Sequence, residues 1–216
     1  MFEVPPTRYV YTFVKENNRF LDGMKNIFIE DKTFSRKDFT LDLLEKGDYE
    51  GCTFTSCNFS NVDLANIRFA NCEFLHCNLS LAKLAGTSLQ DVKFKDCKML
   101  GLRFEHGNPF GFIVQFENCT LNHSSFYRIK LQKTIFKNVQ LQEVDFTESN
   151  LTGAVFDACD LARAIFNNSV LEKTDFRNAI NYIIDPELNR IKKAKFSLFG
   201  VQGLLNKYNI EIDIRN

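Results

Sequence analysis

The chain has 216 residues, of which 44% are hydrophobic, and its formal net charge is zero. A neutral chain predicts no large field of one sign, which excludes partners recognised by net charge alone. No stretch approaches the roughly 18 apolar residues of a membrane span, and the first residues, MFEVPPTRYVYTF, lack a basic region followed by an apolar core. We therefore expect a cytoplasmic protein that does not associate with a membrane.

Residues 1–29 show no firm repeat, in contrast to the sequence that follows them. Residues 9–14 are compatible with an extended strand, and residues 26–29 with the start of a repetitive region. The open end of a repetitive β domain exposes unpaired backbone groups, which natural proteins usually cover. We expect residues 1–29 to form an N-terminal segment with this capping role.

A five-residue period dominates the middle of the chain. Every fifth residue is large and apolar from Phe34 to Phe104 and again from Phe116 to Phe176, where Phe alternates strictly with Leu. From Cys52 onward a small or apolar residue stands two places before each large one, and the other three places are mostly polar. The pattern is looser at the start, where Lys32, Lys37 and Asp42 hold the small position. An α-helix turns by about 100° per residue and a strand alternates its faces, so neither keeps every fifth side chain on one side. The period therefore requires a chain that turns the same way after each five residues, with the large and small residues inside.

The alternation of Phe with Leu indicates an even number of sides in each coil of such a chain. Because two sides cannot enclose a core, four sides are the simplest solution, and one coil then holds about twenty residues. We predict an all-β solenoid over residues 30–198. Its part between Phe34 and Phe176 comprises about seven coils, which makes a rod roughly 35 Å long at the usual spacing of paired strands.

The cysteines occupy the small inward positions rather than a metal site. Their paired spacing superficially suits zinc, but the same spacing follows from the five-residue step. Stacked cysteines one coil apart are close enough for a disulfide, yet parallel side chains give it a poor dihedral angle. We therefore expect reduced core cysteines and no bound metal. The residues concerned are Cys52, Cys57, Cys72, Cys77, Cys97, Cys119 and Cys159.

The period shifts by two residues between Phe104 and Phe116. The intervening segment, residues 105–115, reads EHGNPFGFIVQ, and its Gly-Asn-Pro sequence followed by a second Gly favours a turn. Two extra residues must bulge outward there. We predict a projecting loop at 105–115, with Phe110 and Phe112 as candidates for partial exposure.

The last part of the chain, residues 199–216, departs from the period. Residues 199–208 suit a short helix, and residues 210–214 alternate apolar with acidic side chains as a half-buried strand does. The apolar side chains of this module need a surface to cover them, which is either the end of the rod or a second copy in a twofold dimer. They are Leu204, Leu205, Tyr208, Ile210, Ile212 and Ile214.

The sequence contains no convincing catalytic constellation. His76 and His123 stand at outward positions, and His106 lies in the expected loop. Zinc-protease, phosphate-binding and hydrolase motifs are absent, and an interior filled by alternating large and small side chains leaves no concave ligand site. We therefore expect a protein without catalytic residues or cofactor. A ligand-sized pocket lined by convergent ionisable groups would indicate an enzyme instead.

Segments such as SNVDLANIRF, ESNLTGAVF and ACDLARAIF resemble the A(D/N)LXX motif of pentapeptide-repeat proteins. The resemblance covers about two thirds of the chain. It implies a right-handed quadrilateral β-helix, in agreement with the four-sided coil deduced above.

Within that family the chain is similar to the quinolone-resistance (Qnr-type) proteins in length, in one phase-breaking loop midway, and in its C-terminal module. The resemblance implies a DNA mimic that binds type II topoisomerase (DNA gyrase), does not bind nucleic acid directly, and opposes quinolones. Its loop would contact the enzyme and its C-terminal residues would form a homodimer. A general protein-binding scaffold with another partner is the alternative. The loop residues concerned are His106, Asn108, Phe110, Phe112 and Ile113, and the dimer residues are Leu204, Leu205, Tyr208, Ile210 and Ile212.

Overall fold

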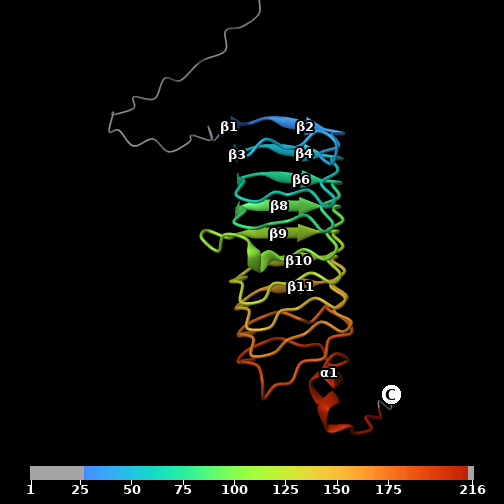
Figure 1. Ribbon diagram of the computed structural model, residues 1–216. Helices are drawn as coiled ribbons and strands as arrows, with labels where there is room; N and C mark the ends of the chain where they lie inside the picture. The colour runs from blue at the N-terminus through green and yellow to red at the C-terminus, as the bar shows by residue number, and fades with distance from the viewer. Residues whose placement is uncertain (1–26, 214–216) are drawn as a thin grey trace, which may run out of the picture.

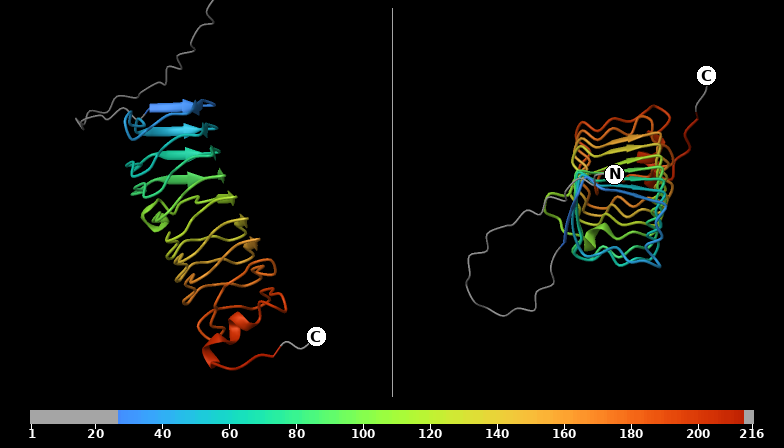
Figure 2. Two further views of the ribbon diagram at one scale, coloured as in Figure 1. Left: turned by 90° about the vertical axis from the view of Figure 1, so that its right-hand side faces the viewer. Right: turned by 90° about the horizontal axis from the view of Figure 1, so that it is seen from above.

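The protein is a straight four-sided rod, described by a computed structural model for residues 27–213 (Figure 1). Seen along its axis, the chain traces a rectangular coil (Figure 2). Residues 1–26 and 214–216 lie outside the described part, and with them most of the segment expected to cap the rod. The predicted all-β solenoid is confirmed.

The first side of the rod, the β1 face, carries a parallel sheet with the strand order β1-β3-β5-β7. Each strand pairs with the strand one coil away, so Tyr49 stands opposite Phe69, and Phe69 opposite Leu89. Single bridges from Lys130 to Arg190 continue this face towards the C-terminus. The strands are β1 (Ile27–Glu30), β3 (Gly47–Glu50), β5 (Arg68–Ala70) and β7 (Ser88–Gln90).

The second side, the β2 face, carries a seven-stranded parallel sheet with the order β11-β10-β9-β8-β6-β4-β2. The remaining two sides, the third face around Phe59 and the fourth face around Leu64, are joined by isolated bridges. Backbone hydrogen bonds link every coil to the next on all four sides, as in Phe59 N–H to Asn78 C=O at 2.7 Å. The strands of the β2 face are β2 (Thr33–Ser35), β4 (Thr53–Thr55), β6 (Glu73–Leu75), β8 (Val92–Lys95), β9 (Val114–Glu117), β10 (Ile135–Lys137) and β11 (Val155–Asp157).

The core consists largely of stacked phenylalanine rings. One ladder runs behind the β2 face with ring centroids 4.7–5.5 Å apart, and a second runs behind the fourth face from Phe104 to Phe166. Rings of the two ladders meet edge to face, as Phe136 and Phe146 do at 6.1 Å. Both arrangements suit the charge distribution of aromatic rings and add to the gain from burying them. The first ladder comprises Phe34, Phe54, Phe74, Phe94, Phe116, Phe136, Phe156, Phe176 and Phe196.

The corners of the coil explain why the polar positions have the composition they do. Two places after most large inward residues the backbone is left-handed, with φ between 51° and 62° at Asn61, Asn71 and His123. Gly, Asn and Asp tolerate this conformation best, and they fill many of these corners. The corner residue thus turns the chain onto the next side.

The rod ends in a shorter helical segment than expected. Within the predicted helix, residues 199–208, only α1 (Gln202–Leu205) is α-helical, and it runs into the 3₁₀ turn η2 (Asn206–Tyr208). Residues 210–213 form no strand, so the strand expected at 210–214 is absent from the part that the structure describes. The helix α1 lies at the end of the rod, where Ile184 N–H donates to Gly203 C=O at 3.1 Å. No helix among residues 27–213 has the length and apolar character needed to cross a bilayer.

Candidate interaction surfaces

The interior of the rod is packed and offers no room for a ligand. A cavity lined by core residues such as Leu84, Leu89 and Phe104 measures about 10 Å³. This is about the space that one water molecule needs. Within residues 27–213, no three His, Cys, Asp or Glu side chains come together as metal ligands.

The seven cysteines are buried and unpaired, as the sequence predicted. Each thiol donates to a backbone carbonyl of the preceding coil at 3.3–3.6 Å, as Cys97 does to Phe74 and Cys119 to Phe94. The hydroxyls of Thr87 and Ser169 make the same bond at 2.8 and 2.9 Å. The small inward position therefore favours a compact side chain with a hydrogen-bond donor.

Burial determines the chemistry of these thiols. It raises the pKa of Cys72 to about 12 and that of Cys159 to about 12. A thiol with such a pKa is almost fully protonated near neutral pH and is a poor nucleophile or metal ligand. Cys72 and Cys159 are therefore structural.

The three histidines lie apart from one another on the surface. His76 faces Asp96 with Nδ1 3.7 Å from the carboxylate, and His123 faces Glu143 at 3.0 Å. His106 is exposed, and its backbone carbonyl accepts a hydrogen bond from Gly86 N–H. These contacts join successive coils and assemble no nucleophile with a base.

The projecting loop lies on the β1 face at the level of β9 (Figure 1). Ser88 still pairs with Asn108 in the regular register, whereas Val92 pairs with Val114, so the two extra residues lie between Asn108 and Val114. The loop is thus narrower than the expected 105–115, because the 3₁₀ turn η1 (Phe104–His106) and strand β9 take up its ends.

The structure separates the five residues predicted to bind a partner. Phe110 is 78% exposed at the tip and Ile113 is 56% exposed at the base. Asn108 accepts a hydrogen bond from Phe110 N–H at 2.9 Å, which fixes the turn. Phe112 instead packs edge-on against Phe104, with ring centroids 6.2 Å apart, and anchors the loop in the core. His106 belongs to η1, one side away from the tip.

The C-terminal module borders a groove of about 880 Å³ at the end of the rod. Of the residues predicted to form a dimer, Leu205, Ile210 and Ile212 line this groove. Leu204 packs against the core, and the Tyr208 hydroxyl donates to Glu187 at 3.0 Å. Neighbouring apolar side chains are also exposed, and sequence periodicity had not indicated them: Ile180, Ile183, Leu188, Leu198 and Phe199.

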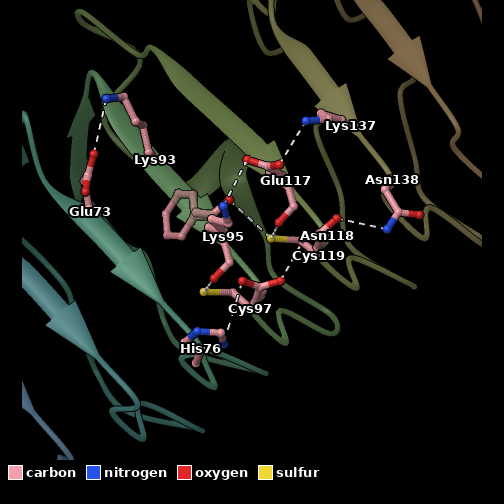
Figure 3. Close-up of polar contacts among 12 residues, drawn as sticks. Glu73, His76, Lys93, Lys95, Cys97, Glu117, Asn118, Cys119, Lys137 and Asn138 are labelled. Atoms are coloured by element: carbon pink, nitrogen blue, oxygen red, sulfur yellow. Dashed lines mark hydrogen bonds and ion pairs between the residues drawn. The ribbon is translucent and has the colours of Figure 1, made fainter.

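Charges on the β2 face largely cancel between neighbouring coils (Figure 3). Lys93 bonds Glu73 at 3.2 Å, and Glu117 accepts from Lys137 at 3.0 Å while Lys95 lies 3.7 Å away. The hydrogen bond from Lys137 lowers the pKa of Glu117 below its ordinary value. This face therefore presents alternating signs rather than an acidic strip.

The β1 face is different, and the sequence had not revealed it. Its coils before the loop carry an excess of carboxylates, whereas its coils after the loop carry an excess of lysine and arginine. The net charge of a sequence segment hides this division, because only one five-residue step in four lies on a given side of the rod.

Comparisons with known proteins agree with this architecture. The family model described as "Pentapeptide repeat region" matches residues 48–108 and 112–181, and the gap between the two matches falls in the projecting loop. No curated protein sequence matches the chain.

Several solved structures are similar in fold, including those of QnrB1 and HetL. A trypsin-treated form of QnrB1, described as a plasmid-mediated fluoroquinolone resistance protein, is 15% identical with a TM-score of 0.56, covering 87% of this chain and 98% of its own. HetL from the cyanobacterium Nostoc sp. strain PCC 7120, described as involved in heterocyst differentiation regulation, is 16% identical with a TM-score of 0.52, covering 82% and 90%. Because the family model matches more than half of the chain and the coil geometry agrees with it, the protein belongs to the pentapeptide-repeat family.

Proposed function

We propose that the protein is a non-enzymatic binding module that presents its projecting loop to a protein partner. The observation that carries the proposal is the exposure of Phe110, 78%, on a loop held by the Asn108 turn and by the buried side of Phe112. An exposed aromatic side chain on a preorganised support is typical of a binding hot spot. The rod supplies the rigid support.

We further propose that the partner is a type II topoisomerase, DNA gyrase, and that binding protects it from quinolones. Two observations support this partner. The chain shares its overall architecture with QnrB1, a fluoroquinolone resistance protein. The β1 face also gathers Glu30, Asp31, Asp48 and Glu50 at one end, which offers a short acidic strip to a groove that normally holds DNA.

A general scaffold with another partner is the second candidate. The ion pairs between neighbouring coils on the β2 face favour a general scaffold, because a DNA mimic needs unpaired carboxylates along most of its length. HetL, with the same fold, is described as a protein of differentiation regulation. The fold is therefore compatible with partners other than gyrase.

The C-terminal groove supports a homodimer in this proposal. Ile210 and Ile212 are 56% and 46% exposed, and with Phe199 they form an apolar rim that a second copy could cover. Such a dimer joins two rods end to end. As a gyrase-binding protein, the chain would act in the cytoplasm, without binding nucleic acid itself.

A supercoiling assay tests the proposal. Purified protein should restore gyrase supercoiling in the presence of a fluoroquinolone, and deletion of Phe110 and Gly111 should abolish this protection. Ile135→Ala, at an exposed site of the β2 face, serves as the control and should protect like the wild type. Absence of protection, together with a pull-down that contains no topoisomerase subunit, would favour the general scaffold.

A further inference from the structure

The β1 face is divided into an acidic half and a basic half. Before the loop, its outward positions hold several carboxylates and one arginine, Arg68, which is bound to Glu50 at 3.2 Å. After the loop they hold lysines, Arg190 and one carboxylate, Glu172, which is bound to Arg190 at 2.6 Å. The outward carboxylates before the loop are Glu30, Asp31, Asp48, Glu50 and Asp91, and the outward lysines after it are Lys130, Lys133, Lys173, Lys192 and Lys193.

Most of these charges form no ion pair within the part of the chain that the structure describes. Among residues 27–213, no ion pair joins the five lysines to a carboxylate, and none joins Glu30, Asp31 or Asp91 to a base. Elsewhere on the rod, neighbouring coils pair their charges, as Arg128 and Glu148 do at 2.7 Å. On the β1 face, most of the charged side chains described make no such pair.

The loop lies at the centre of the division. Four levels of the face precede it, centred on Ile29, Tyr49, Phe69 and Leu89. Four levels follow it, centred on Leu131, Leu151, Leu171 and Ile191. A twofold axis through the level of the loop, parallel to the strands, therefore exchanges the acidic half with the basic half.

We propose that the β1 face binds the β1 face of a second copy of the chain in antiparallel orientation. With the twofold axis at the loop, Glu30 comes opposite Lys192 and Asp31 opposite Lys193 at the ends of the interface. Asp91 comes opposite Lys133 nearer the centre. Such an interface is self-complementary, as twofold symmetry requires. A parallel arrangement would instead place like charges against each other.

Two further features agree with this arrangement. Glu50 and Glu172 are the one like-charged pair brought together, and each already binds an arginine of its own chain. The tips of the two loops meet at the axis, where the exposed Phe110 of each copy can cover the other. The interface then has an apolar centre and a charged periphery, which is the usual anatomy of protein contacts.

The size of the face limits the strength of the association. Nine levels at about 4.8 Å, each about 10 Å wide, give a footprint on the order of 400 Å² per copy. This is about half of what a standard stable interface buries on each side. The charges at its periphery are exposed, so salt should screen them strongly. We expect a weak dimer that forms at high protein concentration and low ionic strength.

A charge-exchange experiment tests the pairing. One full-length variant carries Asp31→Lys and Asp91→Lys, and the other carries Lys133→Glu and Lys193→Glu. All four sites are left-handed corners, and the chain already accommodates Lys at Lys173 and Glu at Glu143 and Glu148 in that conformation. Control variants reverse Lys83 and Lys98, which lie on the fourth and third faces. Sedimentation velocity at about 50 mM and about 500 mM salt measures association, since screening lengths differ several-fold between them.

The wild type should show a salt-sensitive association, and so should the control with Lys83→Glu and Lys98→Glu. Each β1-face variant alone should not associate in this way. Mixing the two β1-face variants should restore the association, because both ends of the mixed pair regain opposite charges. Failure of the mixture to restore the association, or its persistence in each variant alone, would overturn the proposal. An end-to-end dimer through the apolar C-terminal groove resists salt, so it is distinguishable. The Lys133→Glu, Lys193→Glu variant leaves both the loop and the acidic strip of Glu30, Asp31, Asp48 and Glu50 intact, so its gyrase protection tests the proposed function separately.

Discussion

Phe94 and Phe116 stack with their ring centroids 5.5 Å apart and their planes inclined by only 12°, although the chain between them is two residues longer than in the neighbouring coils. The two extra residues therefore lie entirely on the adjoining β1 face, and the stacking of phenylalanine rings behind the β2 face is uninterrupted. A solenoid allows this because each coil contacts only its neighbours. The loop is an addition to the rod, not a part of its support.

Deletion of Phe110 and Gly111 should consequently leave the rod intact. It restores the regular register from Asn108 to Val114 and removes only exposed residues. We expect a melting temperature equal to or slightly above that of the wild type, because a shorter loop loses less entropy on folding. Deletion of Thr152 and Gly153 is the contrasting variant, since it moves Phe156 out of register with Phe136 and should prevent cooperative melting. Equal melting temperatures for both deletions would contradict this account.

Phe136→Ala should strongly destabilise the centre of the rod. The ring is fully buried and stacks on Phe116 at 5.3 Å and on Phe156 at 4.8 Å. Removing a buried phenylalanine costs about 4 kcal/mol, from lost burial and from the cavity left behind. Urea unfolding followed by circular dichroism measures the loss. Ile135→Ala, next in sequence but 45% exposed, should change the unfolding free energy by less than about 0.5 kcal/mol.

The thiols of the native protein should react very slowly. Thiol reagents attack the thiolate, and burial raises the pKa of Cys72 and Cys159 to about 12. At pH 8 we expect a colorimetric thiol reagent to detect almost no cysteine in the folded protein and all seven in urea. A native cysteine that reacts as fast as a free thiol would show that the coils open locally.

Asp175 should stabilise the last coils in a pH-dependent way. The hydrogen bond from Arg177 lowers its pKa below the ordinary 3.8, and Lys195 lies 3.7 Å from the carboxylate. The stabilisation by the Asp175 carboxylate is fully present at a pH above its ordinary pKa of 3.8. It is lost as the pH falls through the lowered pKa of the folded protein, because the carboxylate is then protonated. Asp175→Asn should therefore lower the melting temperature at pH 7 but much less near pH 3. Asp91→Asn, whose carboxylate has no ion pair among the described residues, should have little effect at pH 7.

Ile210→Asp should separate the proposed C-terminal homodimer into monomers. The side chain is 56% exposed in one chain, and a carboxylate there would have to be desolvated if a second copy covered the groove. Light scattering after gel filtration measures the mass. Ile165→Asp, at a 45% exposed site on the fourth face, is the control and should leave the mass unchanged. A wild type that is monomeric at high salt would favour simple capping by residues 199–213.

The sequence predicted the core of the rod almost residue by residue. A strict five-residue period of Phe and Leu is compatible with one assignment of inward positions, and Phe54, Phe136 and Leu141 are buried as expected. The role of the cysteines followed from the same period. Their bonds to carbonyls of the preceding coil could not be predicted, because the period gives the direction of a side chain but not its partner.

The surfaces were harder to predict because they depend on local packing. Phe110 and Phe112 were both expected to be partly exposed, and Phe112 is half-buried, but its contact with Phe104 across the base of the loop could not be predicted. The alternation of apolar and acidic residues predicted a strand at 210–214, but residues 210–213 form none, because alternation gives the faces of a strand and not its pairing partner. The division of charge on the β1 face emerges only when residues are sorted by side, which requires the coil register.

The constant length of the coil makes the rod a molecular ruler. Removing one complete coil, such as residues 135–154, would draw the loop and the C-terminal groove closer by one step, about 4.8 Å, without rotating either around the axis. Adding a coil would separate them by the same step. The distance between the two surfaces can therefore change in fixed increments while every side keeps its orientation, so a single scaffold can be matched to partners of different dimensions.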